Sequence, residues 1–122
     1  MKIGWLCLVG LAVLLMSVPV GAINVEPETI YDTITEGETD WFSRDISSST
    51  FDVHLDWGDT SDSLTLTIYS PDGSYQTFRD KDDGRVDGRI SLTIYDATYG
   101  SWDFRVHGEE VNGVEYYSFT VV

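Results

Sequence analysis

Apolar side chains recur at every second position along most of this chain. In the clearest run, residues 50–57, Phe51, Val53, Leu55 and Trp57 alternate with polar residues. Alternation with period two is typical of a half-buried strand in an antiparallel sheet, whereas an amphipathic helix has a period of 3.6. No window in the rest of the chain shows a convincing helical period. The pattern therefore predicts β-structure.

About eight short strands are expected, separated by turn signals roughly every 8–12 residues, which is the spacing of a β-sandwich or barrel. We predict an all-β, antiparallel, jelly-roll-like β-sandwich. Residues 66–69 and 92–95 share the sequence LTIY and predict two similar hairpins, and residues 74–79 predict an edge strand. The expected strands cover residues 29–35, 40–46, 50–57, 64–69, 74–79, 90–95, 102–107 and 117–121.

The first 22 residues have the features of an export signal. Lys2 precedes an uncharged apolar run, and Val20-Gly21-Ala22 supplies the small residues at which a signal peptidase cuts. We predict a signal peptide over residues 1–22, cleaved after Ala22, and a single domain over residues 23–122. An uncleaved anchor is the alternative, since residues 3–20 are long enough to span a bilayer. Both readings place the domain in the secreted or extracellular-surface space.

Charge limits the partners of this domain. All 21 acidic residues follow residue 22, and the formal net charge of the chain is −14. Such a surface repels nucleic acid and anionic lipid, so neither is expected to bind, and no stable membrane insertion is expected after cleavage. An extracellular protein or polysaccharide is the expected partner. The acidic charge itself serves either solubility in a salty or cell-surface environment or the binding of divalent cations.

Calcium is the candidate cofactor, because it takes several carboxylate and carbonyl oxygens as ligands. Asp80, Asp82 and Asp83 fall on one predicted loop, and residues 58–62 form a second acidic loop. The first loop is not an EF-hand, because no glutamate stands at the closing position. Solvated acidic loops without a bound ion are the alternative.

Four motifs, in this order, resemble those of bacterial and archaeal pre-peptidase C-terminal domains: residues 37–42 (GETDWF), 63–73 (SLTLTIYSPDG), 100–106 (GSWDFRV) and 117–121 (YSFTV). The resemblance covers nearly all of residues 28–122. It implies a jelly-roll-like sandwich, an extracellular setting and an accessory role. Some such domains bind calcium, collagen or other polymers, and the resemblance implies Asp40 as a calcium ligand, with Glu38 beside it. The convertase-type P domain is similar as well.

Catalytic residues show no converging pattern. His54 and His107 occupy outward positions of different predicted strands, no G-x-S-x-G elbow is present, and the single cysteine, Cys7, lies in the predicted signal peptide. We therefore expect no enzymatic activity. A small secreted hydrolase with paired carboxylates is the enzymatic alternative.

Binding of a carbohydrate or protein polymer requires exposed aromatic rings. Trp41, Trp57 and Trp102 alternate with polar residues and are predicted to be buried. Tyr69 and Tyr95 end the two LTIY strands and are expected to lie exposed and adjacent on one outer face. The leading hypothesis is a secreted, non-catalytic module with an interaction or structural role, and a carbohydrate- or protein-polymer-binding domain is the alternative.

Overall fold

The computed structural model describes residues 28–122, except for the side chain of Asp83, and the predicted signal peptide lies outside this range. Each predicted strand is present with its ends displaced by a few residues at most. Within the described residues, no helix is long and apolar enough to cross a membrane. The elements are β1 (Glu28–Ile34), β2 (Thr39–Ile46), β3 (Phe51–Asp56), β4 (Ser63–Tyr69), β5 (Tyr75–Arg79), the 3-10 helix η1 (Asp80–Asp83), β6 (Arg89–Ile94), β7 (Gly100–Glu110) and β8 (Glu115–Val121).

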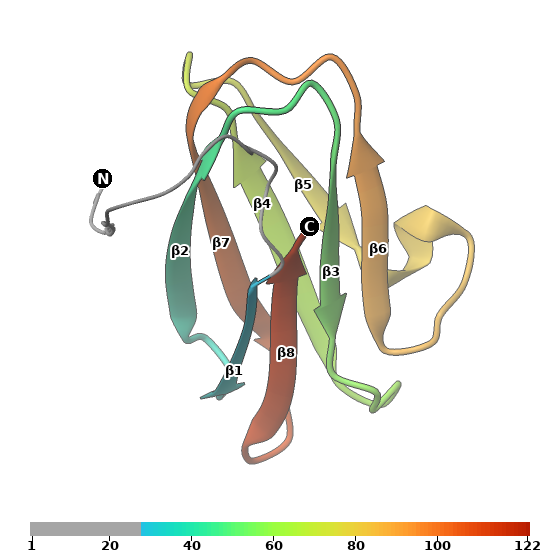
Figure 1. Ribbon diagram of the computed structural model, residues 1–122. Coiled ribbons are helices and arrows are strands. Elements are labelled where there is room, and N and C mark those ends of the chain that lie inside the picture. Colours follow the sequence, from blue (N-terminus) through green and yellow to red (C-terminus); the bar gives the residue numbers. More distant parts are fainter. Residues whose placement is uncertain (1–27) are drawn as a thin grey trace.

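The strands form two four-stranded antiparallel sheets that face each other (Figure 1). Sheet A has the order β1-β8-β3-β6, and sheet B has the order β2-β7-β4-β5. All consecutive strands except β4 and β5 lie in different sheets, so that the chain crosses from one sheet to the other repeatedly. This order is that of an eight-stranded jelly roll, and the predicted fold class is confirmed. As predicted, β5 is an edge strand.

The alternating apolar residues line the space between the two sheets. Phe51, Val53 and Leu55 point inward from sheet A, and each is at most 2% exposed. Phe104 of sheet B is fully buried, and the centroid of its ring lies 6.5 Å from that of Phe51 and 5.3 Å from that of Phe119. The core therefore consists of side chains contributed by both sheets, as period-two strands require.

The prediction of two similar hairpins is correct for one LTIY segment and wrong for the other. Tyr69 pairs with Tyr75 in a β4–β5 hairpin, and the Asp72 carboxylate in the turn accepts a hydrogen bond from the Ser74 backbone N–H, at 2.9 Å. After β6 the chain instead crosses to sheet B, where β7 lies. The Ala97 N–H donates to the Ser49 carbonyl at 2.9 Å, which holds this crossing against the β2–β3 link. Two identical segments are thus followed by different connections, a hairpin turn after Tyr69 and a crossing to the other sheet after β6.

The predicted burial of the three tryptophans is confirmed for Trp57 and Trp102, which are 7% and 6% exposed. It is wrong for Trp41, which is 51% exposed. Trp41 precedes Phe42 in β2, and adjacent residues of a strand point to opposite faces. The Phe42 ring stacks on Phe119 at a centroid distance of 5.2 Å, so Phe42 takes the inward position and Trp41 faces solvent.

Candidate functional site

Three exposed or half-exposed aromatic rings lie together on the outer face of sheet B, and we call them the aromatic band: Trp41 of β2, Tyr69 at the end of β4 and Tyr75 at the start of β5. The ring centroids of Trp41 and Tyr69 are 5.5 Å apart, and those of Tyr69 and Tyr75 are 5.3 Å apart. Both separations fall within the range of favourable aromatic pairs. Trp41 and Tyr75 are 51% and 68% exposed, so the band presents its rings to solvent.

The register of sheet B explains how the band forms. Trp41 pairs with Arg105 on β7, while Tyr69 pairs with the neighbouring outward residue, Asp103. The Trp41 side chain therefore reaches diagonally across β7 to meet Tyr69. The planes of the two rings in each contacting pair are inclined by 37° to each other, so the band is a stepped surface. Asp103, which lies opposite Tyr69 on β7, accepts a hydrogen bond at its carboxylate from the Ser43 hydroxyl at 2.7 Å.

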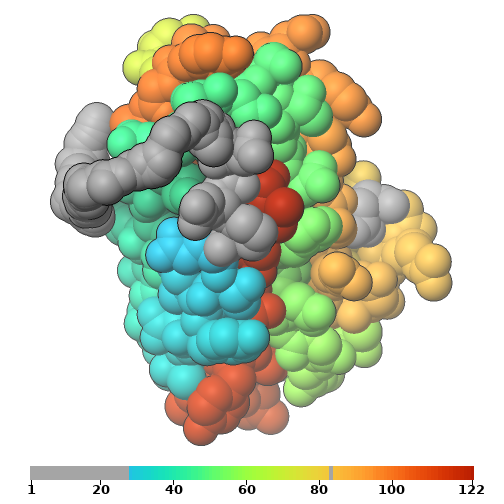
Figure 2. All heavy atoms as spheres, in the orientation of Figure 1, coloured from blue at the N-terminus to red at the C-terminus, as the bar shows by residue number. Residues whose placement is uncertain are grey.

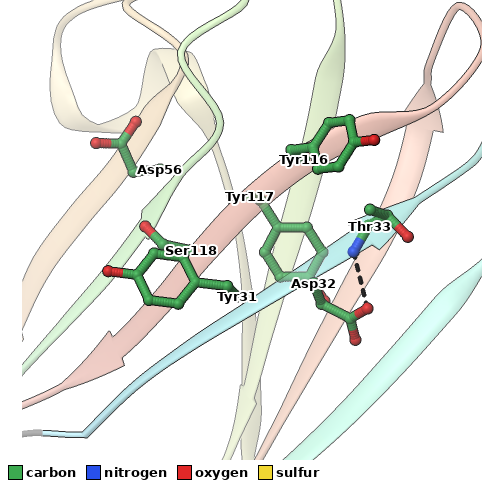
Figure 3. Close-up of a pocket in the computed structure, with 7 residues that line it drawn as sticks. All are labelled: Tyr31, Asp32, Thr33, Asp56, Tyr116, Tyr117 and Ser118. Carbon is green, nitrogen blue, oxygen red and sulfur yellow. Dashed lines mark hydrogen bonds between the residues drawn. The ribbon is translucent and has the colours of Figure 1, made fainter.

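A second aromatic surface lies on the outer face of sheet A, which Figure 2 shows with β1 and β8 side by side. We call it the tyrosine cleft, and its volume is about 530 Å³. Tyr31 pairs with Ser118, and Ser118 pairs with Asp56 of β3. Because the small Ser118 side chain stands between larger neighbours, the surface is hollowed there. The residues that line the cleft, drawn in Figure 3, are Tyr31, Asp32, Thr33, Asp56, Tyr116, Tyr117 and Ser118.

The inner wall of the cleft is tied to sheet B by one hydrogen bond. The Tyr117 hydroxyl donates to Oδ2 of Asp40 at 2.6 Å, which joins β8 to β2. Burial raises the pKa of Tyr117 well above its usual value, and burial also raises the pKa of Asp40. The Asp40 carboxylate, which the family resemblance implies as a calcium ligand, is thus already engaged by a phenol.

Three carboxylates converge at one end of the sandwich, and we call them the carboxylate cluster: Asp59, Asp62 and Glu115. One oxygen of each lies within 4.8 Å of the others. Asp62 is 5% exposed and Glu115 is 9% exposed. The Trp57 indole N–H donates to the backbone carbonyls of Asp59 (2.9 Å) and Asp62 (3.1 Å), which folds the loop so that both side chains approach β8. The Asn112 N–H donates to Oδ1 of Asp62 at 3.1 Å.

The electrostatics of the carboxylate cluster are unfavourable for three full negative charges. Burial raises the pKa of Glu115 to about 7, and the nearby Asp62 and Asp59 add to the effect. Hydrogen bonds from Ser61 lower the pKa of Asp59. The folded cluster therefore holds a proton more readily than three isolated carboxylates do, and its oxygen atoms are of the kind that divalent cations take as ligands.

Among the described residues, the acidic residues predicted to bind metal do not belong to the group of three carboxylates formed by Asp59, Asp62 and Glu115. Asp80 accepts hydrogen bonds from the backbone N–H groups of Gly88 (2.8 Å) and Asp87 (3.2 Å). Asp82 accepts one from the Arg79 N–H at 2.7 Å. These carboxylates hold the β5–β6 connection in shape, while the side chain of the third predicted ligand of this loop, Asp83, lies outside the described residues.

The other predicted pair, Glu38 and Asp40, lies on and just before β2. The Glu38 carboxylate accepts hydrogen bonds from the Thr35 N–H (3.0 Å) and hydroxyl (3.2 Å), and the hydrogen bond from the N–H group is the main cause of its lowered pKa. Glu38 thus caps the β1–β2 turn. Whether any of these residues binds metal stays a prediction.

Tyr69 and Tyr95 do not form the adjacent pair that the sequence suggested. Tyr69 lies in β4 of sheet B, whereas Tyr95 follows β6 of sheet A and is 72% exposed. The reason is the crossing after β6 described above. The rings that meet Tyr69 are instead those of Trp41 and Tyr75.

The two histidines take the outward positions that the sequence predicted, on different sheets. Nδ1 of His54 lies 2.7 Å from the Ser91 hydroxyl on sheet A, and Nδ1 of His107 lies 2.9 Å from the Thr39 hydroxyl on sheet B. A histidine pair therefore cannot contribute to a common zinc site.

Two functional candidates carried a signal that the sequence reasoning missed. Residues 117, 119 and 121 are apolar and alternate with polar residues, and the same phase extended back by one step reaches Glu115, which marks it as a buried carboxylate. In β2, the spacing of Phe42 and Ile46 assigns Trp41 to the outer face. Neither inference requires any information beyond period two.

Comparison with known proteins gives one relative of unknown function. No protein-family model matches the chain. An uncharacterized protein of Archaeoglobus fulgidus is 46% identical over 61 residues, which make up 50% of this chain and 88% of that protein. This chain therefore belongs to the same family as that archaeal protein.

Proposed function

We propose that this chain is a non-catalytic β-sandwich module that acts outside the cytoplasm and binds a polysaccharide through the aromatic band. The observation that carries the proposal is the contiguous contact of Trp41, Tyr69 and Tyr75 on one outer face. Large aromatic rings left in solvent mark binding surfaces, and a half-exposed tryptophan among tyrosines suits stacking on sugar rings.

Other features support this role. Arg105 and Asp103 lie on β7 between the rings, so hydrogen-bonding groups stand beside the apolar surface. The export signal expected over residues 1–22 and the resemblance to pre-peptidase C-terminal domains agree with an extracellular accessory module. The positions of the two histidines, on separate outer faces, favour a module over a hydrolase.

Removal of the Trp41 indole, at one end of the aromatic band, tests this proposal. Trp41→Ala is expected to weaken retention on insoluble polysaccharides by about tenfold or more, because truncation of a tryptophan hot spot costs about 2 kcal/mol. Tyr75→Ala is expected to weaken it less. The measurement is a depletion isotherm on cellulose, chitin and collagen, with Tyr116→Ala on the opposite sheet as the matched control.

Retention on collagen alone would assign the module to a protein polymer and contradict the polysaccharide proposal. Equal retention of Trp41→Ala and wild type would remove the aromatic band as the binding surface.

We also propose that calcium steadies the domain at the carboxylate cluster. A cation there would offset the burial of the Glu115 carboxylate and its repulsion by Asp62 and Asp59, which together raise the pKa of Glu115 to about 7. Because calcium binds the ionised carboxylates, its effect should grow as the pH rises.

The melting temperature with calcium and with chelator provides the measurement. At pH 8, saturating calcium is expected to raise it by several degrees, by mass action on the folded state. Glu115→Gln should abolish the shift, and Asp82→Asn should retain it. A shift that disappears in Asp82→Asn alone would place calcium in the loop at residues 80–84, and no shift in the wild type would remove calcium from the proposal.

A further inference from the structure

The tyrosine cleft shares no residue with the aromatic band and lies on the opposite face of the sandwich. Its walls are two of the most exposed aromatic side chains of the described residues, Tyr31 at 80% and Tyr116 at 73%. They come from neighbouring strands, β1 and β8: Tyr31 pairs with Ser118, and Tyr116 lies two residues before Ser118 on β8. In Figure 3, Tyr31 lies beside Ser118, and Tyr116 lies on the other side of Tyr117.

The charged groups of the cleft are all of one sign. Asp56 and Asp32 are carboxylates, and no lysine or arginine is among the residues that line it. The basic side chain nearest by register is Arg89, which pairs with Asp56 across β3 and β6 and does not line the cleft. Within the described residues, Asp56 has no ion-pair partner at 4.0 Å or less.

Exposed tyrosine faces beside a carboxylate without an ion-pair partner form the environment that attracts an organic cation. The face of a phenol ring carries negative potential and attracts ammonium and guanidinium groups, and a carboxylate accepts their N–H groups. The formal net charge of −14 favours encounter with a positively charged partner over the whole surface. The volume of about 530 Å³ exceeds what a single ammonium group needs and accommodates a long side chain with its flanking residues.

We propose that the tyrosine cleft binds a basic segment of a partner protein, with a lysine or arginine side chain seated between Tyr31 and Tyr116. The Asp56 carboxylate accepts a hydrogen bond from the cationic group, and the Ser118 hydroxyl lies at the base of the seat. The aromatic band stays free in this complex, so the domain can join a basic protein to a second ligand. This inference does not depend on polysaccharide binding.

A short fluorescently labelled oligolysine serves as the probe, and its anisotropy reports binding to the whole chain. The titration is run at about 0.15 M salt, where contacts beyond roughly 8 Å are screened. Asp56→Asn is expected to weaken binding by about threefold or more. The double variant Tyr31→Ala/Tyr116→Ala is expected to weaken it by roughly tenfold, as loss of two cation–π contacts of about 0.5–1 kcal/mol each predicts.

Two matched control variants distinguish binding in the tyrosine cleft from general attraction by charge. Asp45→Asn removes the same charge from an exposed position of β2 on sheet B. Tyr99→Ala removes a tyrosine that is 63% exposed in the β6–β7 connection and belongs to neither the tyrosine cleft nor the aromatic band. Both should bind oligolysine as the wild type does, and an oligoglutamine of equal length should not bind. Equal weakening by Asp45→Asn and Asp56→Asn would show attraction by net charge alone and overturn the proposal. Unchanged binding by the double tyrosine variant would overturn it too.

Discussion

Phe104→Ala is expected to lower the free energy of unfolding by about 3–5 kcal/mol, the largest effect of any single substitution considered. The Phe104 ring is fully buried in β7 and meets the rings of Phe51 and Phe119, which come from the facing sheet. Truncation leaves a cavity between two sheets whose backbones are held by hydrogen bonds and cannot close around it. A domain of this size has about 5–15 kcal/mol of stability, so the loss is a large fraction.

Urea denaturation followed by tryptophan fluorescence measures this effect, because Trp57 and Trp102 are buried in the folded state. Tyr95→Ala is the matched control, since it removes a ring that is 72% exposed, and its effect should stay within about 0.5 kcal/mol. A loss below about 1 kcal/mol for Phe104→Ala would mean that the two sheets do not pack around this ring.

The strands could be predicted from sequence because a sandwich imposes period two on every buried strand. That rule applies locally, so β3 was readable from Phe51, Val53 and Leu55 alone. Pairing between strands was less accessible. Residues 66–69 and 92–95 are identical, yet the first begins a hairpin and the second precedes a crossing to the other sheet. The difference lies in the following residues: the Asp72 carboxylate accepts hydrogen bonds that close the first turn.

The candidate sites were less predictable, because each depends on contacts between distant segments. The acidic run at residues 80–84 is conspicuous in sequence, but Asp80 and Asp82 serve as acceptors for nearby backbone N–H groups. The carboxylate cluster instead joins the loop at residues 58–62, which the sequence did suggest, to Glu115 from the last strand. Only the three-dimensional register brings them together.

Glu115 is expected to make the domain less stable as the pH rises from about 5 to 8. In the folded state, burial and the neighbouring Asp62 raise the pKa of Glu115 to about 7, whereas in the unfolded chain it returns to an ordinary 4.5. Between these two pH values the folded state binds one more proton than the unfolded state. The contribution of Glu115 to the stability is therefore largest below pH 4.5 and is lost as the pH rises through 7. A shift of this size corresponds to about 3 kcal/mol.

Glu115→Gln isolates this contribution, because the amide keeps the shape of the protonated acid and does not titrate. In the presence of chelator, urea denaturation at pH 5 should give similar stabilities for wild type and variant. At pH 8 the variant should be the more stable by up to about 3 kcal/mol, since it carries no charge beside Asp62 and Asp59. Glu110→Gln, which neutralises an exposed carboxylate at the end of β7, should follow the wild type at every pH. If Glu115→Gln and wild type instead lost stability in parallel between pH 5 and 8, the loss would come from the titration of another group. Ionisation of Glu115 beside Asp59 and Asp62 would then not lower the free energy of unfolding.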